Sequence, residues 1–206
     1  IYYFNYQVPT VEETFQGSRQ FTISGSTLIS RDDKIDFALA ELNKMPPADY
    51  RPYLAGWTRN TPKAPYMCIQ HPYGDIKKVS YASEQDVSSY DDGRYGIYWW
   101  VKRWQNGITE SGSSGSPLFD ADGYIVGNLT GGNSFCNTPI NDYFCQFTAS
   151  WDYFSDKSKQ LACHISPANA DVMSMEGYDP YLDLEVKRIS NIKIGDAVAL
   201  NAVENS

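Results

Sequence analysis

Short runs of hydrophobic residues, alternating or continuous, recur along most of the chain, and turn-forming residues separate them. Runs of this length that are rich in β-branched and aromatic residues predict β-strands rather than helices. Within the first sixty residues the predicted strands lie at 1–6, 21–29 and 36–42, and we expect these three to be neighbours in one sheet. The pattern therefore predicts an all-β fold class.

A second set of strands follows a polar connection that contains Pro46, Pro47 and Pro62. The predicted strands of this set lie at 66–70, 77–81, 96–102, 116–119, 124–129 and 143–150. Helical features occur only at 153–163, which has Ser and Asp near its start and carries two lysines, so we predict the chain's one real helix there. After Asn169 the pattern shows no clear element apart from a candidate strand at 179–184.

Composition excludes several classes of protein. Charged residues make up 20% of the 206 residues and aromatic residues 15%, which favours a packed globule over a solvated tail. The net charge of -8 repels phosphate backbones, and the basic residues cluster only in pairs such as Lys77 with Lys78, so we expect no nucleic acid partner. No run approaches eighteen apolar residues, and we expect no membrane span.

The chain starts at Ile1 without Met or a signal-peptide pattern, and we interpret this N-terminus as a cut end. Four cysteines are present, and no pair has the CxxC spacing of a zinc or redox site, so we expect no metal and no cofactor. In an oxidising compartment Cys136 and Cys145 could close a short disulfide loop. Cysteines of an upstream segment are the alternative partners.

A glycine and serine run at 112–117 is the most informative local feature. Alone it would be typical of a flexible linker or a cloning scar. It runs directly into two hydrophobic stretches joined by an Asp-Gly turn, which together predict a β-hairpin. The run is therefore interpreted as a tight turn at the start of a strand.

Such a turn suits a nucleophilic serine. Attack on an amide carbonyl creates an oxyanion, and backbone N–H groups of a glycine turn can be aimed at it in advance. Gly112 and Ser114 would supply those donors, and Gly115 would permit the turn that exposes the Ser114 hydroxyl. Ser113 and Ser116 are rival nucleophiles, but Ser114 alone has glycine two positions before it and one after it.

Several blocks of the chain, in order, resemble the lysyl endopeptidase branch of the trypsin-like serine proteases, and the resemblance runs from residue 1 to about residue 170. The matching blocks are 1–7, 36–43, 55–57, 69–72, Trp104, 107–110, the serine loop and 127–132. The resemblance implies the two-barrel trypsin-like fold with a C-terminal helix. It assigns 1–60 to the surviving part of the first barrel, 64–152 to the second barrel, 153–170 to a C-terminal helix region and 171–206 to an extension or linker.

The same resemblance aligns Asp36 with the triad carboxylate, which orients the catalytic histidine and stabilises its imidazolium. In this family the histidine precedes the strand that resembles 1–7, whereas His71 and His164 lie after Asp36. We expect structural roles for both. The resemblance therefore implies that a missing N-terminal segment of the same protein carries the histidine, and that this chain alone is inactive.

Substrate specificity can be approached in the same way. Trypsin has its pocket acid six residues before the nucleophile, where this chain has Ile108. The resemblance aligns Asp142 with the pocket carboxylate of lysyl endopeptidases. Thr130 replaces their histidine, and Tyr90 is the aromatic residue nearest to the tryptophan that stacks on it. The other residues that the resemblance assigns to substrate binding are Thr109, Thr130 and Gly131.

These observations predict a secreted or cell-surface bacterial serine endopeptidase, which would cleave protein or peptide substrates after basic residues, with Lys favoured. One alternative is a catalytically dead, protease-like binding module that uses the pocket near Asp142. The other is an aromatic-rich β adhesin or carbohydrate-binding domain, suggested by Trp99, Trp100 and Trp104.

Overall fold

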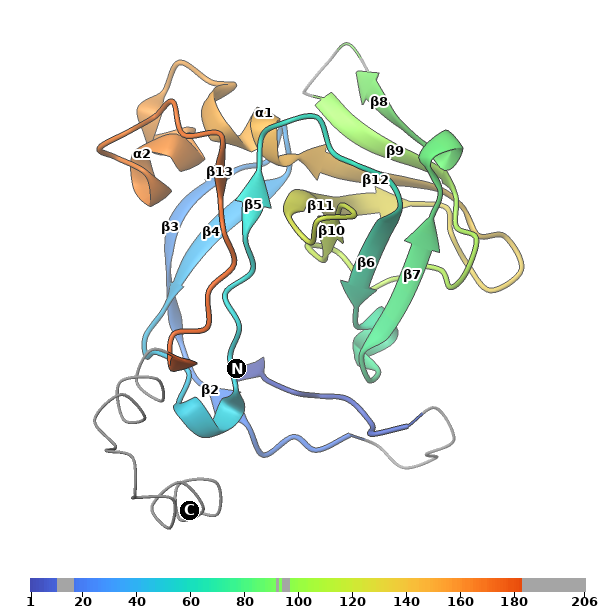
Figure 1. Ribbon diagram of the computed structural model, residues 1–206, viewed down its shortest axis with the longest axis horizontal. Coiled ribbons are helices and arrows are strands. Elements are labelled where there is room, and N and C mark those ends of the chain that lie inside the picture. Colours follow the sequence, from blue (N-terminus) through green and yellow to red (C-terminus); the bar gives the residue numbers. More distant parts are fainter. Residues whose placement is uncertain (11–16, 92, 94–96, 183–206) are drawn as a thin grey trace, which may run out of the picture.

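The structure is a computed structural model that describes residues 1–10, 17–91, 93 and 97–182. These residues form one nine-stranded sheet, two two-stranded sheets and a few short helices (Figure 1). The prediction of an all-β fold is confirmed. The strands of the large sheet are β5 (Trp57–Thr58), β6 (Tyr66–Gln70), β7 (Lys78–Ala82), β8 (Val87–Asp91), β9 (Ile97–Arg103), β10 (Pro117–Phe119), β11 (Ile125–Gly132), β12 (Ile140–Gln146) and β13 (Ser174–Met175).

The large sheet curls around a hydrophobic core. Its strand order is β7-β6-β10-β11-β12-β9-β8, all antiparallel, with β5 parallel to the start of β11 and β13 antiparallel to β5. The predicted hairpin after the serine run is present as β10 and β11, with Pro117 opposite Asn128. The enclosed core consists of Tyr66, Cys68, Ala82, Val101, Trp104, Leu118, Val126, Leu129 and Phe144.

Strand β12 is buried on both faces. Successive side chains of a strand point to opposite faces, so Phe144 enters the core of the curled sheet while Cys145 faces the other way. Cys145 meets a second core, formed with Ile35, Phe37, Trp57, Ala149, Trp151, Leu161 and Ala162. This second core joins the sheet to the N-terminal hairpin and to the helices.

The first sixty residues differ from the predicted arrangement. Strand β1 (Tyr2–Tyr3) pairs with β2 (Thr22–Ile23), whereas β3 (Ser26–Asp32) pairs with β4 (Phe37–Leu42) in a separate sheet. The prediction that 1–6, 21–29 and 36–42 share one sheet is therefore wrong. Gly25 adopts a left-handed φ of 84° and divides the 21–29 run into two strands with different partners.

The helices are short, and only α1, η4 and α2 lie at or beside 153–163, where the sequence predicts one helix. They are η1 (Ala48–Tyr50), η2 (Pro72–Gly74), η3 (Glu84–Asp86), α1 (Phe147–Asp152), η4 (Lys157–Lys159) and α2 (Leu161–Ile165). The strand predicted at 143–150 ends at Gln146, because Ala149 and Trp151 enter the second core from a helix. Likewise 153–163 is not one helix: the Asp156 side chain accepts from the Ser158 N–H and starts the separate turn η4.

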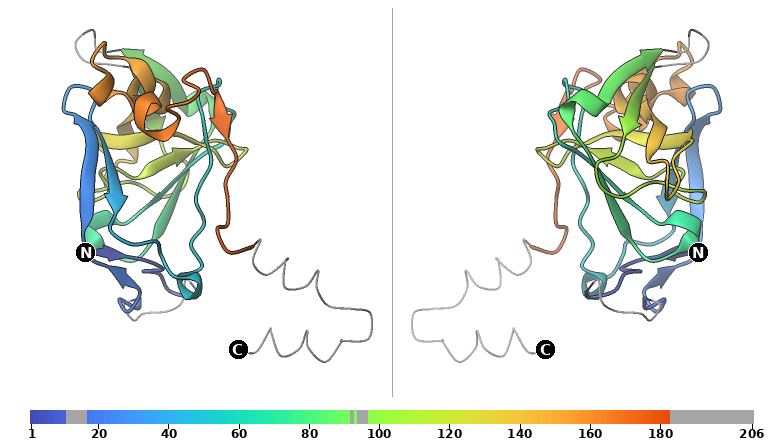
Figure 2. Two further views of the ribbon diagram at one scale, coloured as in Figure 1. Left: turned by 90° about the vertical axis from the view of Figure 1, so that its left-hand side faces the viewer. Right: turned by 90° about the vertical axis from the view of Figure 1, so that its right-hand side faces the viewer.

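The chain beyond the helices returns to the sheet. The segment that carries β13 runs beside the one that carries β5 (Figure 2). Leu54 forms a β-bridge with Tyr178 further along the same two segments. The pattern did not predict β13. The strand predicted at 179–184 is wrong for its described part: residues 179–182 form a turn in which the Tyr181 N–H donates to the Asp179 side chain (2.9 Å). Its last two residues, like the rest of 183–206, lie outside the described residues. Within the described part of the chain, no helix has the length and hydropathy needed to cross a membrane.

The cysteines of the structure are all free thiols. The predicted Cys136–Cys145 disulfide is wrong, because Cys145 is enclosed in the second core while Cys136 lies exposed in the loop between β11 and β12. Burial raises the pKa of the Cys145 thiol to about 11, which leaves it protonated and unreactive at neutral pH.

The burial of the β10 strand gives a direct test of the packing. Leu118 is fully buried in the core of the curled sheet, whereas Leu28 on β3 is 56% exposed. We expect Leu118→Ala to lower the free energy of unfolding by about 2–5 kcal/mol and Leu28→Ala to change it by less than about 0.5 kcal/mol. Urea denaturation of the three proteins measures both values, and equal losses in the two variants would contradict this packing.

Candidate active site

The loop before β10 holds Ser114 in an exposed turn. Gly112 and Gly115 have φ values of 90° and 83°, in the left-handed region that glycine adopts without strain. A side chain at 112 would also press on the backbone of Tyr73, since a Cβ there would lie 3.1 Å from the Tyr73 nitrogen. The loop's conformation therefore requires both glycines.

The three serines of this loop have different surroundings. Ser113 is fully buried, and its hydroxyl donates to Gln70 Oε1. Ser116 is half-buried, and its backbone donates to the Ser113 carbonyl and accepts from Leu129. Ser114 is exposed, and within the described chain its hydroxyl engages no hydrogen bond. It is therefore the serine that is free to act on a substrate.

The backbone around Ser114 leaves two donors open. The Ser113 N–H donates to the Glu110 carbonyl (3.0 Å), and the Gly115 N–H donates to the Leu129 carbonyl (2.7 Å). The N–H groups of Gly112 and Ser114 have no acceptor among the described residues. Two unpaired N–H groups on either side of a buried residue can serve a developing oxyanion.

Asp36 is placed by its two neighbours. Ile35 and Phe37 are both buried in the second core, and Asp36 between them is exposed with a left-handed φ of 54°. Asp tolerates this conformation better than most residues. The Asp36 carbonyl accepts a hydrogen bond from Asn128 Nδ2 (3.0 Å), which connects the β3–β4 turn to β11.

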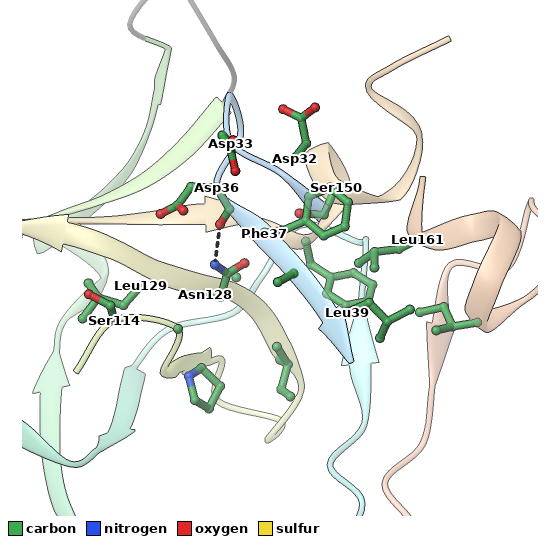
Figure 3. Close-up of a pocket in the computed structure, with 17 residues that line it drawn as sticks. Asp32, Asp33, Asp36, Phe37, Leu39, Ser114, Asn128, Leu129, Ser150 and Leu161 are labelled. Atoms are coloured by element: carbon green, nitrogen blue, oxygen red, sulfur yellow. Dashed lines mark hydrogen bonds between the residues drawn. The ribbon is translucent and has the colours of Figure 1, made fainter. Parts of the chain in front are cut away.

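Ser114 and Asp36 line the same cleft, which has a volume of about 620 Å³. In Figure 3 their side chains lie toward one end of the cleft, and the apolar side chains of Phe37, Leu39 and Leu161 lie toward the other. The lining comes from the β3–β4 hairpin, the serine loop, β11 and the two α-helices. The structure thus brings together the two predicted triad residues from separate parts of the chain.

An ion pair between a buried carboxylate and a partly exposed lysine supports the wall that carries Asp36. The side chain of Asp32 is 3% exposed and lies 2.8 Å from Lys159 Nζ. Burial raises the pKa of this carboxyl, but the hydrogen bonds from Lys159 and from the Lys34 N–H outweigh burial and hold the pKa below its usual range. The Ser30 hydroxyl donates to the Ser158 carbonyl beside it (2.6 Å), so η4 fastens the hairpin in place.

Asp142 is enclosed by polar donors inside the sheet. It is 1% exposed, and its Oδ2 accepts from Trp104 Nε1 (2.5 Å) and Thr109 Oγ1 (2.6 Å). The Ser134 N–H lies 3.4 Å from Oδ1, and the Ser134 side chain also interacts with the carboxyl. Burial raises the pKa of the carboxyl, and these hydrogen bonds oppose the increase. A Cβ at Gly132 would lie 2.1 Å from Oδ1, so only glycine fits beside it.

The other predicted substrate-binding residues differ in their contacts. Thr109 is buried against Asp142. Gly131 pairs with Tyr143 next to an irregularity in β11, where Thr130 lies opposite no residue of β12. The Thr130 hydroxyl is buried and has no hydrogen-bond partner among the described residues. Asp142 and these three residues are not among those that line the Ser114 cleft.

Neither histidine lies at the cleft. His71 stacks on Tyr6, and its Nδ1 lies 2.9 Å from the Asp75 carbonyl. His164 belongs to α2, and its Nε2 lies 3.2 Å from the Ser158 carbonyl. Neither is part of the cleft lining that includes Ser114 and Asp36. Within the described residues, no group of three or more His, Cys, Asp or Glu side chains is arranged to hold a metal ion.

The three clustered tryptophans separate in the fold. Trp104 is buried and bonded to Asp142, and Trp99 packs against the same core and donates to the Val126 carbonyl. Trp100 lies on the opposite face of β9 and stacks on Tyr143. They do not form one binding surface, so the feature that suggested a carbohydrate-binding domain is absent from the described structure.

Two further side chains at this site were not predicted. Asn128 holds the Asp36 carbonyl, and Gln70 of β6 holds the hydroxyl of Ser113. Both lie in blocks of the family resemblance, 69–72 and 127–132, but each acts on a residue that is remote in the sequence, and the sequence alone gave neither a role.

Comparisons with known proteins match most of the chain to one family. The family model described as the lysyl endopeptidase C-terminal domain matches residues 1–145. The chain is 35% identical over 141 residues to the lysyl endopeptidase of Pseudomonas aeruginosa, and the alignment covers 64% of this chain and 29% of that protein.

Two similar solved structures are those of the Rv3671c protease from M. tuberculosis. Its active form gives a TM-score of 0.44 at 19% identity, covering 59% of this chain and 53% of that chain. Its inactive form gives a TM-score of 0.42 at 19% identity, and the match covers 59% of this chain and 60% of that chain.

The Asp32–Lys159 pair predicts a defined pH dependence of stability. Because the pKa of Asp32 is lowered on folding, its contribution is complete above the ordinary value near 3.8 and is lost as the pH falls through the lower, folded value. The melting temperature of the wild type should therefore fall more steeply than that of Asp32→Asn between about pH 5 and about pH 2. Asp33→Asn, at an exposed neighbouring carboxylate, should behave like the wild type. Parallel curves for Asp32→Asn and the wild type would contradict the role of the pair.

Proposed function

This chain belongs to the lysyl endopeptidase family of trypsin-like serine proteases, and from that premise we propose that the complete protein is a serine endopeptidase with Ser114 as its nucleophile. The observation that carries the proposal is the shared cleft, in which an unbonded serine hydroxyl and the carboxylate of Asp36 are exposed together. The alignment covers 29% of the length of the Pseudomonas aeruginosa relative. We therefore propose peptide hydrolysis for the complete protein and not for this chain alone.

The proposed reaction proceeds through an acyl-enzyme. Ser114 Oγ attacks the carbonyl carbon of the scissile peptide bond, and its proton passes to a histidine that Asp36 orients. The carbonyl oxygen becomes an oxyanion, which accepts from the N–H groups of Gly112 and Ser114. The C–N bond then breaks as the histidine returns the proton to the leaving amine, and water hydrolyses the ester by the same steps.

We assign the histidine to a segment of the complete protein that precedes Ile1. His71 and His164 are each engaged with a local carbonyl and do not line the cleft, which supports this assignment. The apolar lining near Phe37 and Leu39 offers that segment a surface to pack on.

The proposal also divides the chain into domains. Residues 1–60 are part of the first barrel, and residues 64–152 are the second barrel around the core of the curled sheet. Residues 153–170 form the helical region and 171–206 an extension.

We further propose that the substrate residue before the cut is basic, with Lys favoured over Arg. Asp142 is a buried carboxylate, and the hydrogen bond from the Ser134 N–H to its Oδ1 is long (3.4 Å). A carboxylate oxygen can accept more than one hydrogen bond, so Oδ1 can also accept from an ammonium group. An opposite charge brought beside a desolvated carboxylate is favourable, whereas a neutral side chain would leave that carboxylate unpaired. Thr109, Thr130 and Gly131 form the surroundings of this subsite. We place the complete protein outside the bacterial cell, in solution or at the surface.

A catalytically dead binding module is the competing function. The observation that favours it is that neither histidine of this chain reaches the Ser114 cleft. The two functions differ in whether the complete protein hydrolyses peptides at all.

The proposed triad predicts the effect of removing the Asp36 charge. In the complete protein, including the segment that precedes Ile1, Asp36→Asn should lower kcat by about 10⁴ because the histidine loses its orienting partner. Asp49→Asn, an exposed residue of η1, should leave kcat unchanged. Steady-state assays on a Lys-containing reporter peptide measure both. A wild type without activity would favour the binding module, and an active Asp36→Asn variant would exclude the triad role.

The proposed specificity predicts a separate loss. Asp142→Asn keeps the size of the side chain and an oxygen for Trp104 and Thr109, so its melting temperature should stay within a few degrees of the wild type. Its preference for Lys over Ala peptides in kcat/KM should fall by about tens- to thousands-fold. The wild-type preference should also decline as the pH falls through the pKa of Asp142, because a protonated carboxyl no longer attracts the ammonium group. An unchanged Lys-to-Ala ratio in the variant would contradict the role of Asp142.

A further inference from the structure

Three buried polar side chains fasten the serine loop to the sheet. Gln70 on β6 is 1% exposed, and Ser80 on β7 and Ser113 in the loop are both fully buried. All three are uncharged, and they form one connected network of hydrogen bonds. Buried polar groups are costly unless each finds a partner, so a connected network at this place needs an explanation.

Gln70 is the centre of the network. Its Oε1 accepts from the Ser113 hydroxyl, and its Nε2 donates to the Ile108 carbonyl and to Ser80 Oγ (3.2 Å). The Ser80 hydroxyl donates to the same Ile108 carbonyl (2.7 Å). The amide of one side chain therefore bonds to both ends of the loop, at 108 and at 113, from a strand of the sheet.

The path of the loop is restricted close to these bonds. Gly107 has a left-handed φ of 75°, and a Cβ there would lie 2.7 Å from the Val79 carbonyl and from Ser80 Oγ. The loop thus lies directly on β7 before it reaches the serine. At its other end, the Tyr73 N–H donates to the Ser111 carbonyl (2.7 Å).

Ser113 lies between the two residues whose N–H groups are open. Its hydroxyl is held by Gln70 on one side, and its own N–H is held by the Glu110 carbonyl on the other. Fixing both the side chain and the backbone of Ser113 restricts the peptide plane that follows it, and this plane carries the Ser114 N–H. The Gly112 N–H belongs to the peptide plane between 111 and 112, which is held by the hydrogen bond from the Tyr73 N–H to the Ser111 carbonyl.

We infer that Gln70 and Ser113 are positioning residues for the oxyanion hole. The brace is the buried, uncharged hydrogen-bond network of Gln70, Ser80 and Ser113, and it holds the loop in the conformation in which the backbone N–H donors point toward the oxyanion. The inference rests on the proposed function and extends it to residues that never touch the substrate. Because no member of the brace titrates near neutrality, its effect on the loop should not change with pH in that range. A preorganised pair of donors stabilises the oxyanion without reorganisation during the reaction.

The test uses Ser113→Ala, Gln70→Met, the double variant and Gln105→Met. Gln105 lies in an exposed loop and serves as the matched control for the Gln-to-Met change. Hydrogen exchange of the complete protein reports the brace without any need for activity. Exchange of the hydrogen-bonded backbone amides of Ser113 and Gly115 should be about tenfold faster in the first three variants, and Gln105→Met should match the wild type.

The second readout is kcat for each titrated active site in the complete protein, measured well below the melting temperature. Ser113→Ala and Gln70→Met should each lower kcat by about 10- to 100-fold with KM changed less than about threefold, and the double variant should be no worse than the poorer single variant. A merely structural role would lower the number of active sites and leave kcat per site unchanged, and that result would overturn the inference.

Failure of the inference and failure of the proposed function can be told apart. A wild type that turns over peptides while Ser113→Ala and Gln70→Met keep full kcat per site would overturn the inference alone. A wild type with no turnover would overturn the proposed function, and with it the catalytic meaning of the brace. Unchanged amide exchange in both single variants would exclude the brace itself.

Discussion

The burial of β12 on both faces is the constraint on which the site depends. Phe144 secures the strand to the core of the curled sheet, and Cys145, next to it, secures the second core that holds Ile35 and Phe37. The turn that carries Asp36 is therefore tied to the same strand that pairs with β11, which lies behind the serine loop. The hydrogen bond from Asn128 to the Asp36 carbonyl completes the connection (Figure 3).

Much of the fold could be predicted because the strands after residue 60 are local features. Tyr66–Gln70 alternates between buried and half-buried positions, and the Asp-Gly turn marks the β10–β11 hairpin. Predictions failed where the outcome depended on remote partners. Strands β2 and β3 are separate because each pairs with a different strand. Residues 147–152 leave the sheet as a helix, which buries Trp151 in a core whose other members come from distant parts of the chain.

The residues of the candidate site also differ in whether the local sequence could predict them. Ser114 could be identified from its own loop, since the glycines and the following hairpin are adjacent in sequence. Asp36 was assigned only through the family resemblance, because its buried neighbours and its contact with Asn128 come from tertiary structure. The depth of Asp142 and the brace from Gln70 could not be predicted, since hydrogen bonds between residues so far apart leave no periodic signal in the sequence.

The central claim is that Ser114 is the nucleophile of a serine endopeptidase, with the histidine supplied from outside this chain. Treating the complete protein with diisopropyl fluorophosphate and mapping the adduct by peptide mass spectrometry tests it most directly. The account predicts one label per molecule, on Ser114, and labelling of the present chain slowed by about a million-fold. A label on Ser113 or Ser116, no label on the complete protein, or rapid labelling of the present chain would contradict it.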